Sequence, residues 1–286
     1  MDMIKIKEQL KEGAQLVKES CAFLLATPSL IIYLAIPTIV ILAIHFLYYL
    51  ISLRQLPSIE LLLNGFNDLM NISLTGPNWL WYIIVVQIIF GITLLTNLCS
   101  VALAAHTIDM ANNSSIKNWQ IYLWHAWSRI LPIIVWSLTE TVFYLLLYKI
   151  SSLPSFGFYI GLILNMGLVL CWALVTFFVI PIIAHEKMPI LSTIMKSYRI
   201  VYDCWWQALS GKGIIFIVTT VLITLFTLPR FFVNMTTNTM LIAICACIIL
   251  SIKMVSSTVD IIFKSTLYYN ETEPAIELAT MEFTEF

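Results

Sequence analysis

The sequence predicts an all-α protein: a polytopic membrane helix bundle of about six transmembrane helices with three cytoplasmic amphipathic interfacial helices. The first observation behind this is the composition. Of 286 residues, 60% are apolar and only 11% are charged, whereas soluble domains are typically about 25% charged. The second is the length of the apolar runs, and the third is the distribution of Lys and Arg between them.

Six apolar runs are long enough to cross a bilayer, since a hydrocarbon core of about 30 Å needs roughly 20 helical residues. The predicted spans are residues 30–53, 79–104, 130–147, 157–184, 213–233 and 239–262. Pro37 and Pro181 are expected to kink or end helices rather than abolish spans. The chain then divides into an N-terminal amphipathic cytoplasmic helix (1–28), a transmembrane domain (29–264) and an acidic cytoplasmic tail (265–286).

The basic residues give this bundle an orientation. With the N-terminus inside, the cytoplasmic segments hold eleven cations: Lys5, Lys7, Lys11, Lys18, Lys117, Arg129, Lys187, Lys196, Arg199, Lys212 and Lys264. The opposite face receives three, namely Arg54, Lys149 and Arg230. This excess predicts a multi-pass protein with both termini cytoplasmic, because an even number of spans returns the chain to the same side.

An amphipathic segment precedes the first, third and fifth spans. The apolar positions that share a helical face are Ile6, Leu10, Ala14, Val17 and Cys21 in the first, Ile116, Trp119, Leu123 and Trp127 in the second, and Leu191, Ile194, Tyr198, Val201 and Trp205 in the third. Such helices lie at a membrane surface. Trp119, Trp127, Trp205 and Trp206 are the predicted interfacial anchors.

The second half of the chain resembles a known family. The run from Cys171 through Thr176-Phe-Phe to Pro181, a basic helix with Ser197-Tyr198-Arg199, Trp205-Trp206, and a closing Leu267-Tyr268 pair are similar to a family of uncharacterised bacterial membrane proteins that carry a domain of unknown function. The likeness is strongest over residues 171–269. It implies six helices and a bacterial inner membrane, and no established activity.

Ionisable side chains inside the predicted spans are the first candidates for a site, because a charge in the membrane is costly unless it is paired or hydrated. Glu140 lies roughly 16 Å from the cytoplasmic end of its span, near the midplane. Lys253 and Asp260 share one face of the sixth span. The other polar candidates in spans are His45, Gln87, Asn97 and Asn165.

Two interpretations of Glu140 stay open. In the functional one, Glu140 is a protonatable or ion-coordinating group. In the structural one, Lys253 or a proton neutralises Glu140, which then fastens helices together. Lys253 is also a potential partner of Asp260.

Familiar catalytic motifs are missing from the sequence. There is no G-x-S-x-G, P-loop, Rossmann glycine or H-E-x-x-H pattern. The four histidines, His45, His106, His125 and His185, are not spaced for joint metal ligation on one helix. We therefore assign no catalytic residue, metal or cofactor.

The predicted function is that of a non-enzymatic membrane protein, either a transport or channel-like bundle or a membrane organiser that binds partners or lipid through its interfacial helices. The expected partners are the lipid bilayer and a second copy or another membrane protein; a net charge of −1 gives no reason to expect nucleic acid. Two alternatives remain: a secreted effector that inserts in host membranes by an acidic C-terminal signal, and a membrane-embedded enzyme acting on lipid.

Overall fold

A computed structural model describes residues 3–53, 79–112, 118–151, 158–227 and 239–284, and every regular element in these ranges is a helix. The first half of the chain forms α1 (Met3–Ala26), the 3-10 turn η1 (Pro28–Leu30), α2 (Ile31–Leu53), α4 (Trp79–Ala111), α5 (Trp119–Ser128) and α6 (Ile130–Ser151). The second half forms α7 (Phe158–Val175), α8 (Val179–His185), α9 (Ile190–Asp203), α10 (Trp205–Thr227) and α12 (Thr239–Thr284). The predicted all-α bundle is confirmed.

Helix α4 forms the centre of the bundle. It packs against α2, α5, α6, α8 and α12, and ten consecutive residues from Cys99 to Ile108 are all buried. A helix that is apolar on every side is stable only when neighbours surround it, and the small side chains of Ala102, Ala104 and Ala105 allow those neighbours to approach closely. α4 therefore continues to Ala111, past the predicted end of its span at 104.

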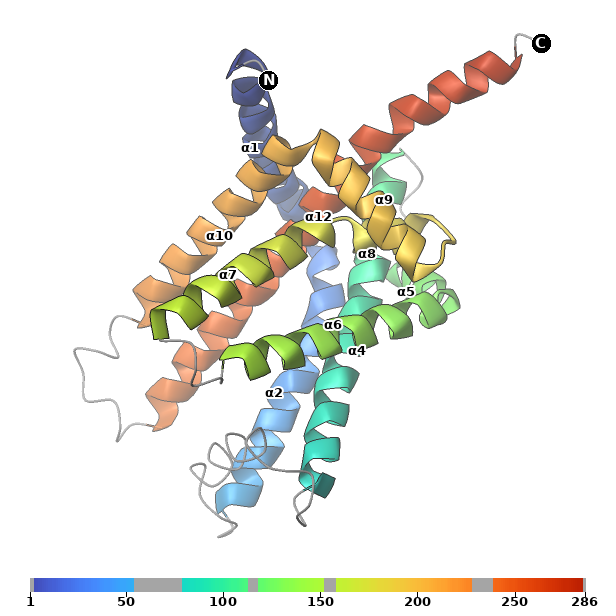
Figure 1. The fold of residues 1–286 in the computed structure, drawn as a ribbon. Helices are drawn as coiled ribbons and strands as arrows, with labels where there is room; N and C mark the ends of the chain where they lie inside the picture. The colour runs from blue at the N-terminus through green and yellow to red at the C-terminus, as the bar shows by residue number, and fades with distance from the viewer. Residues whose placement is uncertain (1–2, 54–78, 113–117, 152–157, 228–238, 285–286) are drawn as a thin grey trace.

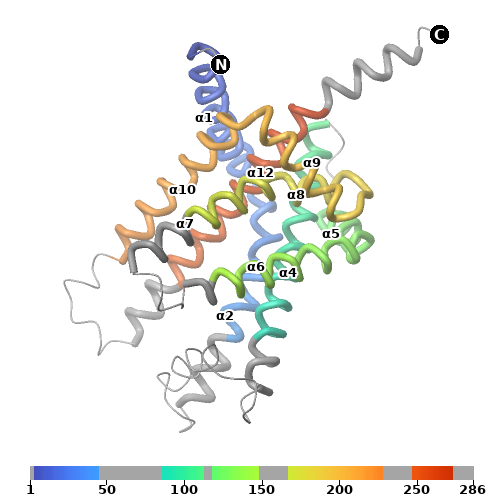
Figure 2. The backbone as a smooth tube through the Cα atoms, in the orientation of Figure 1, coloured from blue at the N-terminus to red at the C-terminus, as the bar shows by residue number. Residues whose placement is uncertain are grey.

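The long helices pack as neighbours in the chain: α2 with α4, α6 with α7, and α10 with α12. Figure 1 shows the first and last of these pairs diverging from the end of the molecule where α5, α8 and α9 lie. The tube view places α1 at this same end, beside the start of α10 (Figure 2), and α1 packs along α10 and α12.

Each of the three segments predicted to lead into a span forms a helix of its own, separated from the next helix by a break. Between Met3–Ala26 and Pro28–Ile44 the axis turns by 95°. At the other two junctions one residue leaves the helical conformation: Arg129 has φ −104° and ψ 20°, and Cys204 has φ −109° and ψ 28°. These nearly equal backbone angles lie close to the bridge region, which interrupts a helix without requiring glycine. α10 consequently begins at Trp205, ahead of the predicted start of the fifth span at 213.

Within the described residues, four helical stretches are long and apolar enough to cross a membrane. They are Val86–Ala111, Ile130–Leu147, Gly167–His185 and Trp205–Thr227. The bent pair of α1 and α2 would make a fifth if it is one span. The described side chains of α12 include Lys253, Asp260 and Lys264, and a total of six spans stays a prediction. α2 runs through Pro37 and α8 contains Pro181, so neither proline ends its helix.

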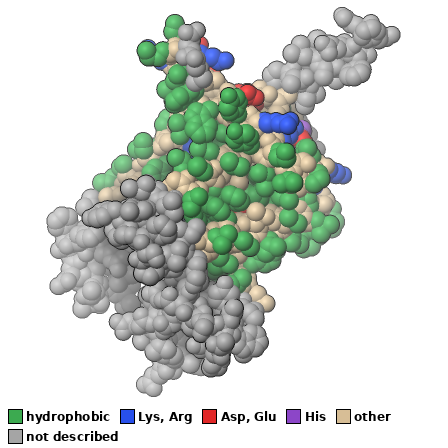
Figure 3. Space-filling model, viewed as in Figure 1, with side chains coloured by type: hydrophobic (Ala, Val, Ile, Leu, Met, Phe, Trp, Pro, Cys, Tyr) green, Lys and Arg blue, Asp and Glu red, His purple; other side chains and the backbone are tan. Residues whose placement is uncertain are grey.

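The surface of the bundle is largely apolar. In Figure 3, hydrophobic side chains are spread over the coloured part of the visible face, and the Lys, Arg, Asp and Glu side chains lie near the end where α1 and α9 lie. Large apolar residues on α6 and α10 are exposed, among them Leu131, Leu138, Phe216 and Ile217. Exposure of this extent marks a surface that another apolar phase covers, so the helices have the character of membrane-inserted segments.

Candidate functional site

Two of the polar residues singled out in the spans meet in the structure. Asn97 on α4 donates a hydrogen bond from Nδ2 to Glu140 Oε2 (2.7 Å) and another to Ser137 Oγ (3.0 Å), both on α6. Asn97 and Ser137 are buried, while Glu140 is partly exposed. Hydrogen bonds from a neighbouring helix offset the expense of a polar group inside a membrane, so this cluster joins α4 to α6.

Asp260 lies in an ion cluster between α10 and α12. Its Oδ1 is 2.7 Å from Lys212 Nζ and its Oδ2 is 2.8 Å from Lys264 Nζ. Lys264 Nζ also lies 5.1 Å from the centre of the Phe177 ring, a cation–π contact. Lys253 is exposed, and among the described residues it forms no ion pair with Glu140 or Asp260.

The remaining candidates are Gln87, His45, Asn165 and the predicted tryptophan anchors. Gln87 is exposed, and the side chains of His45 and Asn165 lie outside the described residues. Of the predicted anchors, Trp127 and Trp205 are exposed, and Trp119 and Trp206 are partly buried.

Side chains from α5 and from the break between α5 and α6 bind the backbone carbonyl groups at the end of α8. The Arg129 guanidinium donates to the carbonyl oxygens of Ile183, His185 and Glu186, which are groups that a helix C-terminus leaves without intrahelical donors. His125 Nε2 on α5 donates to the carbonyl oxygen of Ala184 at 3.0 Å. A cation at a helix C-terminus also interacts favourably with the helix dipole.

The carboxylate of Glu186 connects the end of α8 to α9 and α12, and we call these contacts the α8 junction. It accepts hydrogen bonds from Lys196 on α9 and from the Tyr268 hydroxyl on α12. Burial by itself would raise the pKa of Glu186, but the bonds from Lys196 and Tyr268 outweigh it and lower that pKa below its ordinary value. Burial, together with the bond to Glu186, raises the pKa of Tyr268, which therefore remains a donor.

The start of α8 is also bound to α9, by residues within the 171–269 segment that resembles the family. The chain leaves helical geometry between α7 and α8, and there the backbone N–H of Phe178 donates to Ser197 Oγ at 3.0 Å. Phe178 and Ser197 are fully buried. Ser197 thus supplies an acceptor for a backbone donor at the start of α8.

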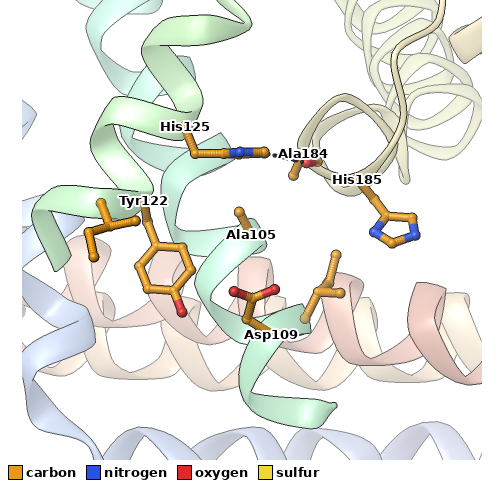
Figure 4. Close-up of a pocket in the computed structure, with 8 residues that line it drawn as sticks. Ala105, Asp109, Tyr122, His125, Ala184 and His185 are labelled. Carbon is orange, nitrogen blue, oxygen red and sulfur yellow. Dashed lines mark hydrogen bonds between the residues drawn. The ribbon is translucent and has the colours of Figure 1, made fainter. Parts of the chain in front are cut away.

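A pocket of about 180 Å³ opens beside this junction. Its walls come from α4, α5 and α8 and consist of Ala105, Ile108, Asp109, Ile121, Tyr122, His125, Ala184 and His185. In Figure 4 the Asp109 carboxylate lies between Tyr122 and His185, and His125 spans the opening toward Ala184.

A buried histidine contacts one of the residues that line the pocket. His106 on α4 stacks on the Tyr122 ring, with ring centroids 4.2 Å apart and planes 10° from parallel. Its Nδ1 lies 3.0 Å from the Tyr33 hydroxyl of α2. The spacing of the histidines along the chain gave no sign of this arrangement, because His106, His125 and His185 come from three helices. Within the described residues, no group of three His, Cys, Asp or Glu side chains is placed to hold a metal ion.

Comparison with known proteins gives a family and no activity. A family model described as a family of unknown function, DUF6159, matches residues 77–275. No curated protein matches the chain, and no solved structure does. The match extends on both sides of the 171–269 segment that carries the resemblance in sequence. Because it covers more than half of the chain, this protein belongs to the DUF6159 family of unknown function.

Proposed function

We propose that this protein is a non-enzymatic, multi-pass membrane protein that organises lipid at one face of a bacterial inner membrane, with α5 and α9 lying in the interface. The observation that carries the proposal is the surface of α9. Leu191, Met195, Tyr198 and Tyr202 recur every three or four residues and are exposed, Tyr202 by 74%. They form a continuous apolar face on the outside of the molecule.

A surface helix in water would expose mainly polar side chains. The buried residues of α9 are Thr193, Ser197 and Val201, and the partly buried Ile190, Ile194 and Ile200 also pack against the core. The structure divides the face predicted from sequence, because Val201 is buried while Leu191 and Tyr198 are exposed. Several large apolar side chains of α9 therefore lie outside the protein core. Since burial of one large apolar side chain is worth about 1.5–3 kcal/mol, contact with lipid gives α9 a favourable location.

Helix α5 has the same character. Ile121, Trp124 and Trp127 are exposed, Trp124 by 74%, while Tyr122 and Ala126 face the core. Trp and Tyr are the residues enriched where hydrocarbon meets headgroups. The excess of Lys and Arg in the segments assigned to the cytoplasm supports a cytoplasmic location for this face and for both termini.

Photocrosslinking tests the proposal in the native sequence. The protein would be reconstituted with a phospholipid that carries a photoreactive diazirine on its acyl chain, and crosslinked residues would be mapped by mass spectrometry. We expect adducts on Met195, Tyr202 and Trp124, at levels comparable with those on Phe216 and Ile217 of α10. Adducts restricted to α10 and the other long helices would refute the proposal.

A matched pair of variants sharpens this test. Tyr202→Asp places a charge in the apolar face and should reduce crosslinking along α9, whereas Tyr202→Phe keeps the ring and should preserve it. Equal labelling of the two variants would count against lipid contact at this helix.

A second candidate function, ion or proton transport, is favoured by the contact between Asn97 and Glu140. It places a carboxylate and an amide from two spans within 2.7 Å of each other, as a site for a cation or proton would require. A proton or cation flux assay in proteoliposomes with Glu140→Gln tests this alternative. It requires that the wild-type protein conducts protons or cations and that the variant does not.

A further inference from the structure

Helix α1 carries a stripe of exposed side chains that the rest of the bundle leaves uncovered. Residues three, four or seven positions apart share one side of a helix. Three lysines with an apolar residue at each end follow these spacings, and all five are exposed: Ile4, Lys7, Lys11, Lys18 and Leu25. We call these five residues the lysine stripe.

The two ends of the lysine stripe are apolar anchors without a place in the protein core. Ile4 is 72% exposed and Leu25 is 83% exposed. Between them, each lysine has a hydrocarbon stem that can lie along an apolar surface while its ammonium group stays in a polar layer. Apolar anchors together with lysines on one side of a helix are typical of a helix at the boundary between acyl chains and headgroups.

The acidic residues of α1 occupy a different side of the helix. Glu8, Glu12 and Glu19 repeat the spacing of the three lysines one residue later, which turns them by about 100° around the helix axis. Glu12 accepts a hydrogen bond from Gln207 Nε2 of α10 at 2.6 Å, so the acidic side adjoins the bundle. Lys5 also lies on this side. Apart from Lys5, the charges of opposite sign on the described part of α1 are therefore segregated.

The charges of the lysine stripe are not balanced within the bundle. Lys7 and Lys11 are one helical turn apart, and like charges at this spacing repel. In the part of the chain that the structure describes, no ion pair includes a residue of the lysine stripe. Anionic groups outside the protein would reduce this repulsion, and their negative charge is complementary to that of the stripe.

The direction of α1 brings the lysine stripe to the level of headgroups. The axis turns by 95° between Met3–Ala26 and Pro28–Ile44. With α2 crossing the bilayer, as the sequence predicts, this turn lays α1 along the membrane surface. The phosphates of the lipids in that leaflet are then within reach of the lysine side chains.

We propose that the lysine stripe binds anionic phospholipids of the leaflet on which α1 lies, with the ammonium groups at the headgroup phosphates and the two apolar ends among the acyl chains. The inference rests on the proposed function and names the class of lipid that the protein organises. An anionic surface attracts the lysine stripe and repels the acidic side, which fixes the rotation of α1 about its own axis.

Photocrosslinking with two matched lipids tests the proposal. Full-length protein would be reconstituted in phosphatidylcholine vesicles that contain a small fraction of diazirine-bearing phosphatidylglycerol or, separately, of phosphatidylcholine with the same diazirine acyl chain. Adducts on Ile4 and Leu25 would be normalised to those on Val221, an exposed residue of α10. We expect phosphatidylglycerol to label α1 at least about fivefold more than phosphatidylcholine, roughly the effect of one lysine near an anionic surface. Equal labelling by the two lipids would overturn the proposal.

Two triple variants with the same spacing form a matched pair. The first removes the cations of the stripe and should bring the labelling ratio of the two lipids close to unity: Lys7→Gln, Lys11→Gln and Lys18→Gln. The second neutralises the same number of charges on the acidic side and should keep or raise the ratio: Glu8→Gln, Glu12→Gln and Glu19→Gln. An unchanged ratio in the lysine variant, or an equal loss in both variants, would contradict the proposal.

The wild-type protein provides a test that needs no substitution. In about 1 M sodium chloride the Debye length is about 3 Å, so the attraction between exposed charges is largely screened. The preference of α1 for phosphatidylglycerol should then fall towards that of the lysine variant. A preference that salt does not change would show that charge does not select the lipid.

The same experiment separates this proposal from the proposed function. Adducts on Trp124 and Tyr202 together with equal labelling of α1 by both lipids would reject anionic selection by the lysine stripe and leave the proposed function standing. An α1 that neither lipid labels would show that the stripe has another occupant and would also overturn the proposal. Absence of adducts on α5 and α9 would reject the proposed function itself.

Discussion

At the scale of single residues, Gly13 lets α1 pack tightly against α10. A Cβ atom at this position would lie 2.1 Å from Ser210 Oγ and 2.4 Å from the backbone oxygen of Gln207. The serine side chain can rotate away, but the carbonyl oxygen moves only with helix α10. Gly213, by contrast, has open space where a Cβ would be.

Gly13→Ala should therefore destabilise the protein by about 1–3 kcal/mol, the usual effect of overpacking a close contact. Gly213→Ala is the matched control and should leave stability unchanged or raise it by about 0.5–1 kcal/mol, because alanine favours a helix over glycine. Thermal unfolding in detergent, followed by circular dichroism, measures both. Equal melting temperatures for the two variants would show that α1 does not pack on α10 in this way.

The residues of the site differ in how well the sequence predicted them. Asn97 and Glu140 were both candidates, because polar groups in apolar runs can be recognised without a structure, and they are in contact. Lys253 was the partner expected for Asp260 from the sequence, whereas the structure pairs Asp260 with Lys264, four residues further along the helix. Lys212 could not have been recognised as the second partner, since it is 48 residues away in the chain and only the pairing of α10 with α12 brings it near.

At the scale of elements, the junction of α8, α9 and α12 depends on one carboxylate. Glu186 has a pKa below its ordinary value of 4.5, so it stabilises the folded state while it is ionised. A lowered pKa gives stability that is present above the ordinary value and lost as the pH falls through the folded-state pKa. This contribution should thus be complete at neutral pH and disappear from about pH 4.5 downward.

Glu186→Gln should lower the melting temperature at pH 7 and have progressively less effect as the pH falls below about 4.5, because the wild-type carboxylate is then protonated. Melting temperatures of both proteins between pH 7 and pH 3.5 measure this. Glu8→Gln removes an exposed carboxylate from α1 and should show no such convergence. A constant difference between Glu186→Gln and the wild type over this range would mean that ionisation of Glu186 does not stabilise the junction.

At the scale of the whole molecule, the proposal requires both termini on the cytoplasmic side. The topology depends on the bent pair of α1 and α2. Its 95° turn is compatible with an interfacial α1 before a spanning α2 and also with a segment that re-enters the same side. Reporter domains fused to each terminus, with a third inserted in the predicted outward loop 54–78, measure the topology in bacterial cells. We expect the two termini inside and the loop outside. Termini on opposite sides would establish an odd number of spans.

The sequence by itself determined that this protein is an α-helical bundle with membrane character and that it belongs to an uncharacterised family. Hydropathy and the 20-residue length of a span are local properties, so they can be read from consecutive residues. The tertiary structure alone decided which polar groups meet. The pocket draws Asp109, Tyr122 and His185 from three helices, and the exposure of Leu191 and Tyr198 depends on what the other side of α9 packs against. Contacts between helices distant in the chain depend on the packing of the complete bundle, which no local pattern of residues encodes.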